Sequence, residues 1–270
     1  MREYDKIVEL VAQCACCLPE DVRKSLEQES GKGGYVLDAI LENENLSCSK
    51  STPMCQDTGT PIFYVRAPKG EDLRRLEETI RAAVDEATKS VPLRENAVDP
   101  LTSKNTGSNN PVIYFEPSMD EHTHVQLLLK GGGSENLTRL YSLPDRRLDA
   151  GRDRLGLIKC VLDAVYEAQG KGCPPYFIGV AVAGLADQAL HISKKQLMRE
   201  VTKPSEDGEL AVLEGQLLEK TNQLGIGLGA GEKAKTVLSV KIGKHTRNPP
   251  SYFVAVTFNC WALRRGELTL

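Results

Sequence analysis

Apolar residues recur at helical spacing along the first fifty positions of the chain. An apolar stripe over residues 7–14 predicts a first helix. A proline and two acidic residues within 18–21 suit the first turn of a second helix, and a third is expected at about 35–45. The glycine pair 33–34 breaks the chain between them. Residues 1–50 are therefore predicted to form an N-terminal helical segment.

Beyond that segment the apolar pattern alternates between helical and strand spacing. Helices are predicted over residues 72–89, 151–169, 185–199 and 208–223. Strands are predicted over residues 62–66, 112–115, 124–130, 176–183, 237–242 and 252–258. The PSMDEH segment between the second and third of these strands favours a hairpin. The prediction is an α+β fold with mixed sheets, a hairpin and flanking helices, in a single domain over residues 1–270.

Composition and charge narrow the class of protein. The 270 residues are 40% hydrophobic and 26% charged, with 34 Lys and Arg against 37 Asp and Glu, so the formal net charge is −3. This composition excludes a disordered chain, and the lack of a basic excess argues against general binding of nucleic acid. No apolar run approaches the roughly 20 residues of a membrane helix, and the N-terminus is unlike a signal peptide. We therefore expect a cytoplasmic protein.

The chain contains many cysteines but no short metal-binding motif. The eight cysteines are Cys14, Cys16, Cys17, Cys48, Cys55, Cys160, Cys173 and Cys260. No set of cysteines has the full spacing of a zinc finger, and the nearest cluster is Cys14-Ala15-Cys16-Cys17. Disulfides are rare in a reducing compartment. A metal site would have to draw on cysteines that are distant in sequence.

Three of these cysteines stand at the ends of predicted strands. Cys55 precedes the 62–66 strand, Cys173 precedes the 176–183 strand, and Cys260 follows the last strand. Three thiolates that converge from strand ends could hold a soft metal or an iron–sulfur cluster. Spacing alone fits three ordinary buried cysteines better, because free cysteine is among the most buried residue types.

Other polar and glycine-rich segments allow more than one interpretation. Asp57 could hydrogen-bond its own turn, and Arg94, in a polar loop, could clamp a carboxylate or remain an ordinary surface arginine. GIGLGA matches G-x-G-x-x-G loosely through Gly225, Gly227 and Ala230. A helix precedes it and a strand follows, the reverse of a dinucleotide-binding turn, so we favour a loop with positive φ angles.

Several segments together resemble one family, the class I, iron–sulfur-dependent fumarate hydratases and tartrate dehydratases. The shared motifs are CQDTG at 55–59, Leu93-Arg94 with Asn105-Thr106-Gly107, KGGGSEN at 130–136, Cys173-Pro174-Pro175, and Cys260-Trp261-Ala262 with Arg264-Arg265. They occur in the family's order across about residues 50–266. The length matches the α subunit of the family's two-subunit form.

The resemblance implies a cofactor and an activity. In the family, cysteines at these motifs bind a [4Fe–4S] cluster, so the implied ligands are Cys55, Cys173 and Cys260. Three ligands leave one iron open to act as a Lewis acid. The implied reaction is the reversible dehydration of a small hydroxy-dicarboxylate, of the malate and fumarate type in preference to tartrate.

The resemblance also implies roles for residues that face the substrate. Gln56 and Asp57 would lie beside the cluster and contact substrate, with Asp57 as the proton-transfer residue. Arg94 would pair with a substrate carboxylate, and Gly132 and Gly133 would offer backbone contacts. The remaining five cysteines are interpreted as structural or incidental.

A separate β subunit is implied as well, in an (αβ)₂ or homo-oligomeric assembly, because that part of the family supplies further catalytic groups. The sequence departs from the family at Asn248, where a histidine is common, with His245 three residues away, and in the altered glycine loop. These departures motivate an alternative, a diverged non-catalytic paralogue with a binding or assembly role. A zinc-dependent lyase that uses the same cysteines is a third interpretation.

Overall fold

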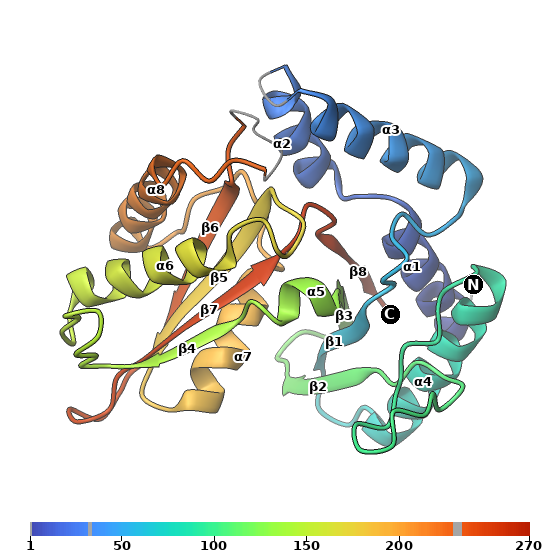
Figure 1. Ribbon diagram of the computed structural model, residues 1–270. Helices are drawn as coiled ribbons and strands as arrows, with labels where there is room; N and C mark the ends of the chain where they lie inside the picture. The colour runs from blue at the N-terminus through green and yellow to red at the C-terminus, as the bar shows by residue number, and fades with distance from the viewer. Residues whose placement is uncertain (1, 32–33, 229–233) are drawn as a thin grey trace. The chain divides into compact units, whose positions relative to one another are not determined.

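Two mixed sheets of four strands each organise the computed structural model, which describes residues 2–31, 34–228 and 234–270 (Figure 1). Each sheet lies in its own compact unit. The first unit comprises Met1–Pro19, Ile40–Gly132 and Ala262–Leu270, and the second comprises Glu20–Ala39 and Gly133–Trp261. The predicted α+β class with mixed sheets is confirmed.

The sheet of the first unit contains the 112–115 and 124–130 strands, but they are not neighbours. Its strands lie in the order β2 (Val112–Pro117), β1 (Thr60–Ala67), β3 (His124–Lys130) and β8 (Arg264–Thr269). β1 pairs in parallel with β2 and antiparallel with β3. The predicted hairpin is therefore wrong. β1 is buried along most of its length, and a buried strand takes a central position with a partner on each side.

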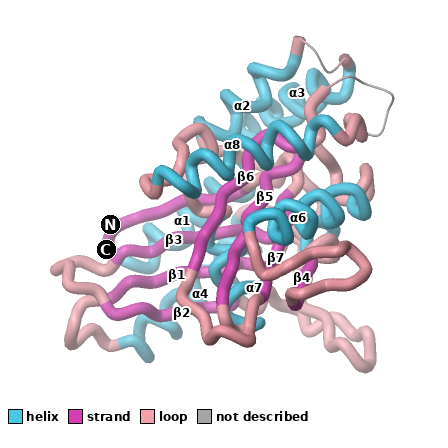
Figure 2. Tube along the Cα trace, turned by 90° about the vertical axis from the view of Figure 1, so that its left-hand side faces the viewer, coloured by secondary structure: helices cyan, strands magenta, loops and turns pink. Residues whose placement is uncertain are grey.

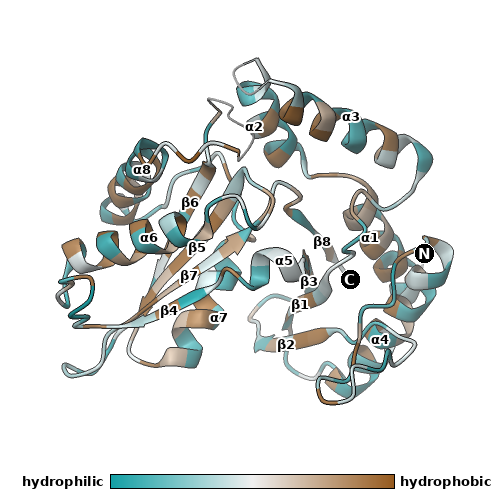
Figure 3. Cartoon of the chain, viewed as in Figure 1, coloured by the Kyte–Doolittle hydropathy of each residue, from teal (hydrophilic) through white to brown (hydrophobic). Residues whose placement is uncertain are grey.

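One face of this sheet packs against helices α1 (Glu3–Cys16) and α4 (Leu73–Ser90). Apolar residues at alternate positions of β1 and β3, such as Phe63 and Leu127, form a core with the two helices. The side chain of Asp72 caps α4 by accepting a hydrogen bond from the backbone N–H of Arg75. Figure 3 shows the alternating hydrophobic and hydrophilic bands along the helices. The predicted helix over 72–89 is confirmed.

The sheet of the second unit has helices on both faces (Figure 2). Its strands lie in the order β4 (Arg139–Ser142), β7 (Phe253–Asn259), β5 (Tyr176–Ala183) and β6 (Val237–Lys244). Helices α6 (Arg154–Ala168) and α8 (Gly208–Gln223) cover one face, and α7 (Ala186–Gln196) contacts the other. The predicted helices and strands of this region are confirmed. The short elements β4, β8 and α5 (Gly132–Glu135) were not expected from the sequence.

The described residues up to position 50 are mostly helical, as predicted. Helices α2 (Glu20–Ser30) and α3 (Tyr35–Lys50) follow α1, and α3 continues five residues beyond its expected end. Gly34, at φ +62°, confirms the chain break, while Gly33 lies outside the described residues. None of the helices in the described ranges is long and apolar enough to cross a membrane.

A disulfide joins the end of α1 to α3, contrary to the expectation for a reducing compartment. It links Cys17 to Cys48, whose Cα atoms lie 4.8 Å apart. The segment that follows is also fastened to these helices. The Ser47 hydroxyl donates to the Cys16 carbonyl oxygen at 2.7 Å, and the Met54 N–H donates to the Ala15 carbonyl at 3.1 Å. The disulfide therefore lies in the scaffold that precedes Cys55.

Candidate active site

The free cysteines divide into two groups by exposure. Cys14, Cys16 and Cys160 are buried, and burial raises the pKa of the Cys14 and Cys160 thiols to about 12. By contrast, the remaining free thiols are partly or fully exposed; they belong to Cys55, Cys173 and Cys260. The three cysteines predicted as ligands are thus the free thiols that solvent reaches. Buried thiols with a raised pKa are poor sources of the thiolate that a metal requires.

Two of the predicted ligands lie side by side in the second unit. Cys173 stands just before β5 and Cys260 just after β7, and these strands run antiparallel with Phe177 opposite Asn259. The Trp261 N–H donates a 3.2 Å hydrogen bond to the Cys173 carbonyl oxygen. The strand ends thus bring the backbone at Cys173 next to that at Trp261, and the use of the two thiols as ligands stays a prediction.

The turn that carries Cys173 is held by a buried tyrosine. The Tyr176 hydroxyl donates to the Gln169 carbonyl oxygen at 2.8 Å and accepts from the Gly172 N–H at 3.1 Å. Burial raises the pKa of the Tyr176 phenol to about 12, so it remains a neutral donor. Cys173 adopts φ +59°, a left-handed conformation that is uncommon for residues other than glycine and is concentrated at functional sites. Sequence reasoning missed Tyr176, which looked like an ordinary first residue of a buried strand.

In the first unit, the CQDTG motif forms the turn into β1. Asp57 Oδ2 accepts a 2.7 Å hydrogen bond from the Gly132 N–H, and its Oδ1 accepts a 3.1 Å bond from the Gly59 N–H. Gly59 adopts φ +81°, and a Cβ there would lie 3.0 Å from backbone carbons of Leu129 and Lys130. Only glycine fits this position without strain. The motif therefore fixes a half-buried carboxylate two residues after Cys55.

The same turn is tied to the loop that carries Arg94. The Thr58 hydroxyl donates to the Arg94 carbonyl oxygen at 2.9 Å and accepts from the Asn96 side-chain amide at 2.9 Å. The side chains of Arg94 and Gln56 are both exposed, so each is available to a ligand. The structure thus connects Asp57, Gly132 and the Arg94 loop within one unit. Gly133 begins the second unit.

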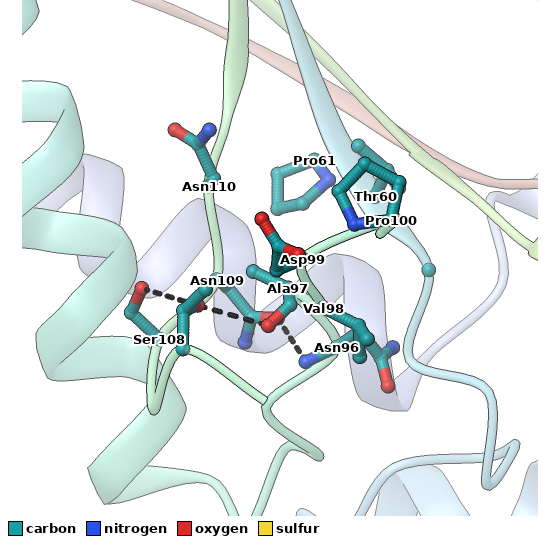
Figure 4. A pocket seen from close by; sticks show the side chains of 12 residues that line it. Thr60, Pro61, Asn96, Ala97, Val98, Asp99, Pro100, Ser108, Asn109 and Asn110 are labelled. Atoms are coloured by element: carbon teal, nitrogen blue, oxygen red, sulfur yellow. Dashed lines mark hydrogen bonds between the residues drawn. The ribbon is translucent and has the colours of Figure 1, made fainter. Parts of the chain in front are cut away.

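A polar cavity of about 560 Å³ opens along this loop (Figure 4). It is lined by Gly59, Thr60, Pro61, Asn96, Ala97, Val98, Asp99, Pro100, Thr106, Ser108, Asn109 and Asn110. The Asn96 N–H donates to the Asn109 side-chain oxygen at 2.9 Å, which closes the base of the loop. The cavity adjoins the glycine end of CQDTG and includes Thr106 of the Asn-Thr-Gly motif, so two of the recognised motifs meet in it.

His245, which could replace the histidine that the family has at position 248, lies away from Cys173 and Cys260 in the second unit. His245 and Asn248 are exposed in the connection between β6 and β7. β7 begins there and ends beside Cys260, and seven extended residues span roughly 23 Å. His245 is therefore remote from the Cys173 and Cys260 pair.

The possible metal ligands of the chain include the three thiols that the motifs imply. Within the part of the chain that the structure describes, no three His, Cys, Asp or Glu side chains form a metal-binding group. The second unit presents the Cys173 and Cys260 thiols, and the first presents Cys55. Thiolate sulfur is the donor that iron–sulfur clusters use, so these residues fit the cofactor by their chemistry and accessibility.

One residue near Asp57 was not assigned a role from the sequence. Arg264, at the start of β8, is 1% exposed. In the sequence Arg264 is followed by a second arginine, Arg265. Alternation along a strand would bury one of the two, but the sequence does not say which. A complete burial of this charge could not be inferred.

Accessible thiols, a carboxylate fixed by backbone N–H groups and an exposed arginine are features of a candidate enzyme of the α+β class. A sequence profile of the fumarate hydratase (Fumerase) family matches residues 4–269. The chain therefore belongs to the fumarate hydratase family.

Individual relatives agree with this assignment. A Geobacillus stearothermophilus protein, provisionally named fumarate hydratase class I, is 40% identical over 276 residues, which cover 97% of this chain and 54% of the relative. The chain thus spans about half the length of that protein. A Methanocaldococcus jannaschii protein, provisionally named L(+)-tartrate dehydratase subunit alpha, is 38% identical over 98% of this chain and 96% of its own length. The L(+)-tartrate dehydratase subunit alpha of Escherichia coli K12 is 31% identical over 98% and 90%, respectively.

Proposed function

We propose that the chain is the α subunit of an iron–sulfur hydro-lyase that reversibly dehydrates a small hydroxy-dicarboxylate. The observation that carries the proposal is that the cysteines of the family motifs are also the accessible free thiols. The cysteines at the three motifs are the free cysteines that are not buried, in a chain that matches the family over residues 4–269. Malate and fumarate are the preferred substrate pair, and tartrate is the alternative within the same reaction class.

The cofactor of the proposed enzyme is a [4Fe–4S] cluster with Cys55, Cys173 and Cys260 as ligands. When bound, such a cluster supplies a Lewis acid at the iron that has no protein thiolate. The hydrogen bond from Trp261 to the Cys173 carbonyl supports the joint use of Cys173 and Cys260.

The chain's own residues would bind the substrate and move a proton. Asp57 exchanges the proton on the carbon next to the departing hydroxyl, and its carboxylate is held for this by the Gly59 and Gly132 N–H groups. Arg94 would bind a substrate carboxylate through its exposed guanidinium. Gln56, Gly132 and Gly133 would complete the binding surface.

A partner subunit and a compartment follow from the same proposal. Two of the relatives are named as alpha subunits, which supports a separate β subunit that contributes further groups to the site. An (αβ)₂ assembly would serve this arrangement. The thiols proposed as ligands must be reduced to bind a cluster, which supports a cytoplasmic location, whereas the Cys17–Cys48 disulfide argues in the opposite direction.

Anaerobic co-expression with the proposed β subunit tests the proposal. The purified pair should contain about four iron and four sulfide per αβ pair and should hydrate fumarate or dehydrate tartrate. Cys173→Ser should lose most of the iron and the activity, whereas the matched change Cys160→Ala, at a buried thiol, should keep both. Iron-free active protein, or a Cys173→Ser variant with full iron content, would show that the ligand assignment is wrong. A loaded pair without activity on either substrate would show that the proposed reaction is wrong.

A further inference from the structure

Arg264 is a buried charge, and among the described residues two of its three guanidinium nitrogens have no hydrogen-bond partner. Its side chain is among the largest that are fully buried, with 1% of the residue exposed. In the described part of the chain, neither Nε nor Nη1 of its guanidinium has a hydrogen-bond partner. Burial of a charge without paired donors is strongly unfavourable. Residues that lower the stability of a fold in this way are generally found at functional sites.

The strand pairing explains where this charge lies. β1 and β8 both pair antiparallel with β3, so the first residues of β1 and β8 lie beside the last residues of β3, at one end of the strands. Arg264 is the first residue of β8 and sits opposite Leu129. The CQDTG turn leads into β1 at this end, and Gly131 follows β3. Three segments that are distant in sequence therefore meet within the first unit.

Asp57 and Arg264 face the same glycine at this end of the strands. A Cβ on Gly131 would lie 3.2 Å from Asp57 Oδ2 and 3.7 Å from Arg264 Nη2. The absence of a side chain at Gly131 thus leaves the carboxylate and the guanidinium as near neighbours. Lys130, also buried, adds a second cation here, and its Nζ donates to the Gly131 carbonyl oxygen at 3.4 Å. Lys130 thus contacts the backbone at Gly131, whereas the Asp57 carboxylate and the Arg264 guanidinium both lie within 4 Å of the position of a Gly131 Cβ.

We propose that Arg264 is a positioning residue for Asp57. Its buried guanidinium balances the charge of the carboxylate and keeps it in the orientation set by the N–H groups of Gly59 and Gly132. The inference rests on the proposed function, in which Asp57 transfers the proton. Arg264 itself contacts no substrate in this role; it acts through Asp57.

Kinetics and stability of the αβ pair test the inference together. Arg264→Met should lower kcat about 100-fold, the effect of displacing a catalytic group by about 1 Å, and leave KM within about threefold. Its urea midpoint of unfolding should stay close to that of the wild type, because two of the donors removed, Nε and Nη1, have no hydrogen-bond partner in the ranges that the structure describes and Asp57 is only half-buried. Arg264→Lys, which restores the charge, should recover about tenfold of kcat, an amount equivalent to one well-formed charged contact.

Two further variants sharpen the result. Gly131→Ala places a methyl group between Asp57 and Arg264 and should also lower kcat, without removal of any charge. The matched control is Arg66→Met, at an exposed arginine on β1 of the same sheet, which should leave kcat unchanged.

The failures are distinguishable. If Arg264→Met keeps the wild-type kcat, or loses kcat and stability together with no recovery in Arg264→Lys, the positioning role is wrong and the proposed function stands. If the iron-loaded wild-type pair has no turnover on any hydroxy-dicarboxylate, the proposed function is wrong and the role of Arg264 falls with it.

Discussion

The backbone N–H of Gly132 donates a 2.7 Å hydrogen bond to Asp57 Oδ2 across 75 positions of sequence. This bond fastens the turn before β1 to the end of β3. Together with the bond from the Gly59 N–H, it gives each carboxylate oxygen of Asp57 a backbone donor. The carboxylate is thereby oriented by main-chain atoms, which are less mobile than side chains.

Replacement of Asp57 by asparagine should separate its chemical role from its structural one. Asp57→Asn keeps one oxygen acceptor and loses the other, so the free energy of unfolding should fall by only about 1 kcal/mol. kcat should fall by about 10² to 10⁴, the usual contribution of a proton-transfer residue. Steady-state kinetics of the αβ pair and urea unfolding measure both effects, with Asp85→Asn on the exposed side of α4 as the control. Full activity in Asp57→Asn would remove Asp57 from the reaction.

Gly59 should be intolerant of substitution for two reasons that a matched glycine can separate. Gly59→Ala incurs both the cost of φ +81° and the contact of its Cβ with backbone carbons at 3.0 Å. Gly70, at φ +96°, has open space around its Cβ position, so Gly70→Ala incurs the conformational cost alone. We expect a loss of about 1 kcal/mol for Gly70→Ala and about 3 kcal/mol for Gly59→Ala, measured by urea unfolding. Equal losses would contradict the steric argument.

The sequence predicted the elements whose signal is local. The apolar period of α4 and the continuous apolar run of β5 are properties of neighbouring residues, and both were found where expected. Strand pairing is a long-range property. β2 and β3 are close in sequence, yet each pairs with β1, because a strand buried on both sides needs two partners. β8, with its run of charged residues, lacks the alternation that marks a strand.

The residues of the candidate site that belong to short sequence motifs could be predicted from the sequence. CQDTG pointed to Cys55 and Asp57, and strand ends pointed to the neighbouring Cys173 and Cys260. The burial of Arg264 depends on the pairing of β8 with β3, which the sequence pattern does not encode. For the same reason, His245 seemed close to the cysteines in sequence but lies at the opposite end of β7.

The Cys17–Cys48 disulfide should be measurable by thiol counting and by stability. Protein unfolded without reductant should titrate six free thiols, and reduction should reveal all eight. The bridge spans 31 positions, so Cys48→Ser should lose about 3 to 4 kcal/mol of unfolding free energy through the greater freedom of the unfolded chain. Reductant should destabilise the wild type but leave Cys48→Ser unchanged. Eight thiols titrated without reductant would contradict the pairing.

Asp163 on α6 should make the second unit more stable above acidic pH. Arg147 donates to both carboxylate oxygens, at 2.8 Å and 2.7 Å, and the Tyr141 hydroxyl donates to Oδ2 at 2.9 Å. The hydrogen bonds from Arg147 are the main reason that the pKa of Asp163 lies below its ordinary value. A carboxylate with a lowered folded-state pKa stabilises the fold above its unfolded pKa, near 4, and this contribution is lost as the pH falls through the folded-state pKa.

Arg147→Met should therefore weaken the dependence of stability on acid pH. Arg147 is 61% exposed, so solvent screening keeps the contribution of the pair small. Urea unfolding at pH 6 and at pH 3 should show a larger loss of stability in the wild type than in Arg147→Met. Arg74→Met is the matched control, because Arg74 pairs with Glu78 on the exposed surface of α4 and should change the pH dependence little. An identical loss in Arg147→Met and the wild type would show that Asp163 does not depend on Arg147 for its acid-sensitive contribution.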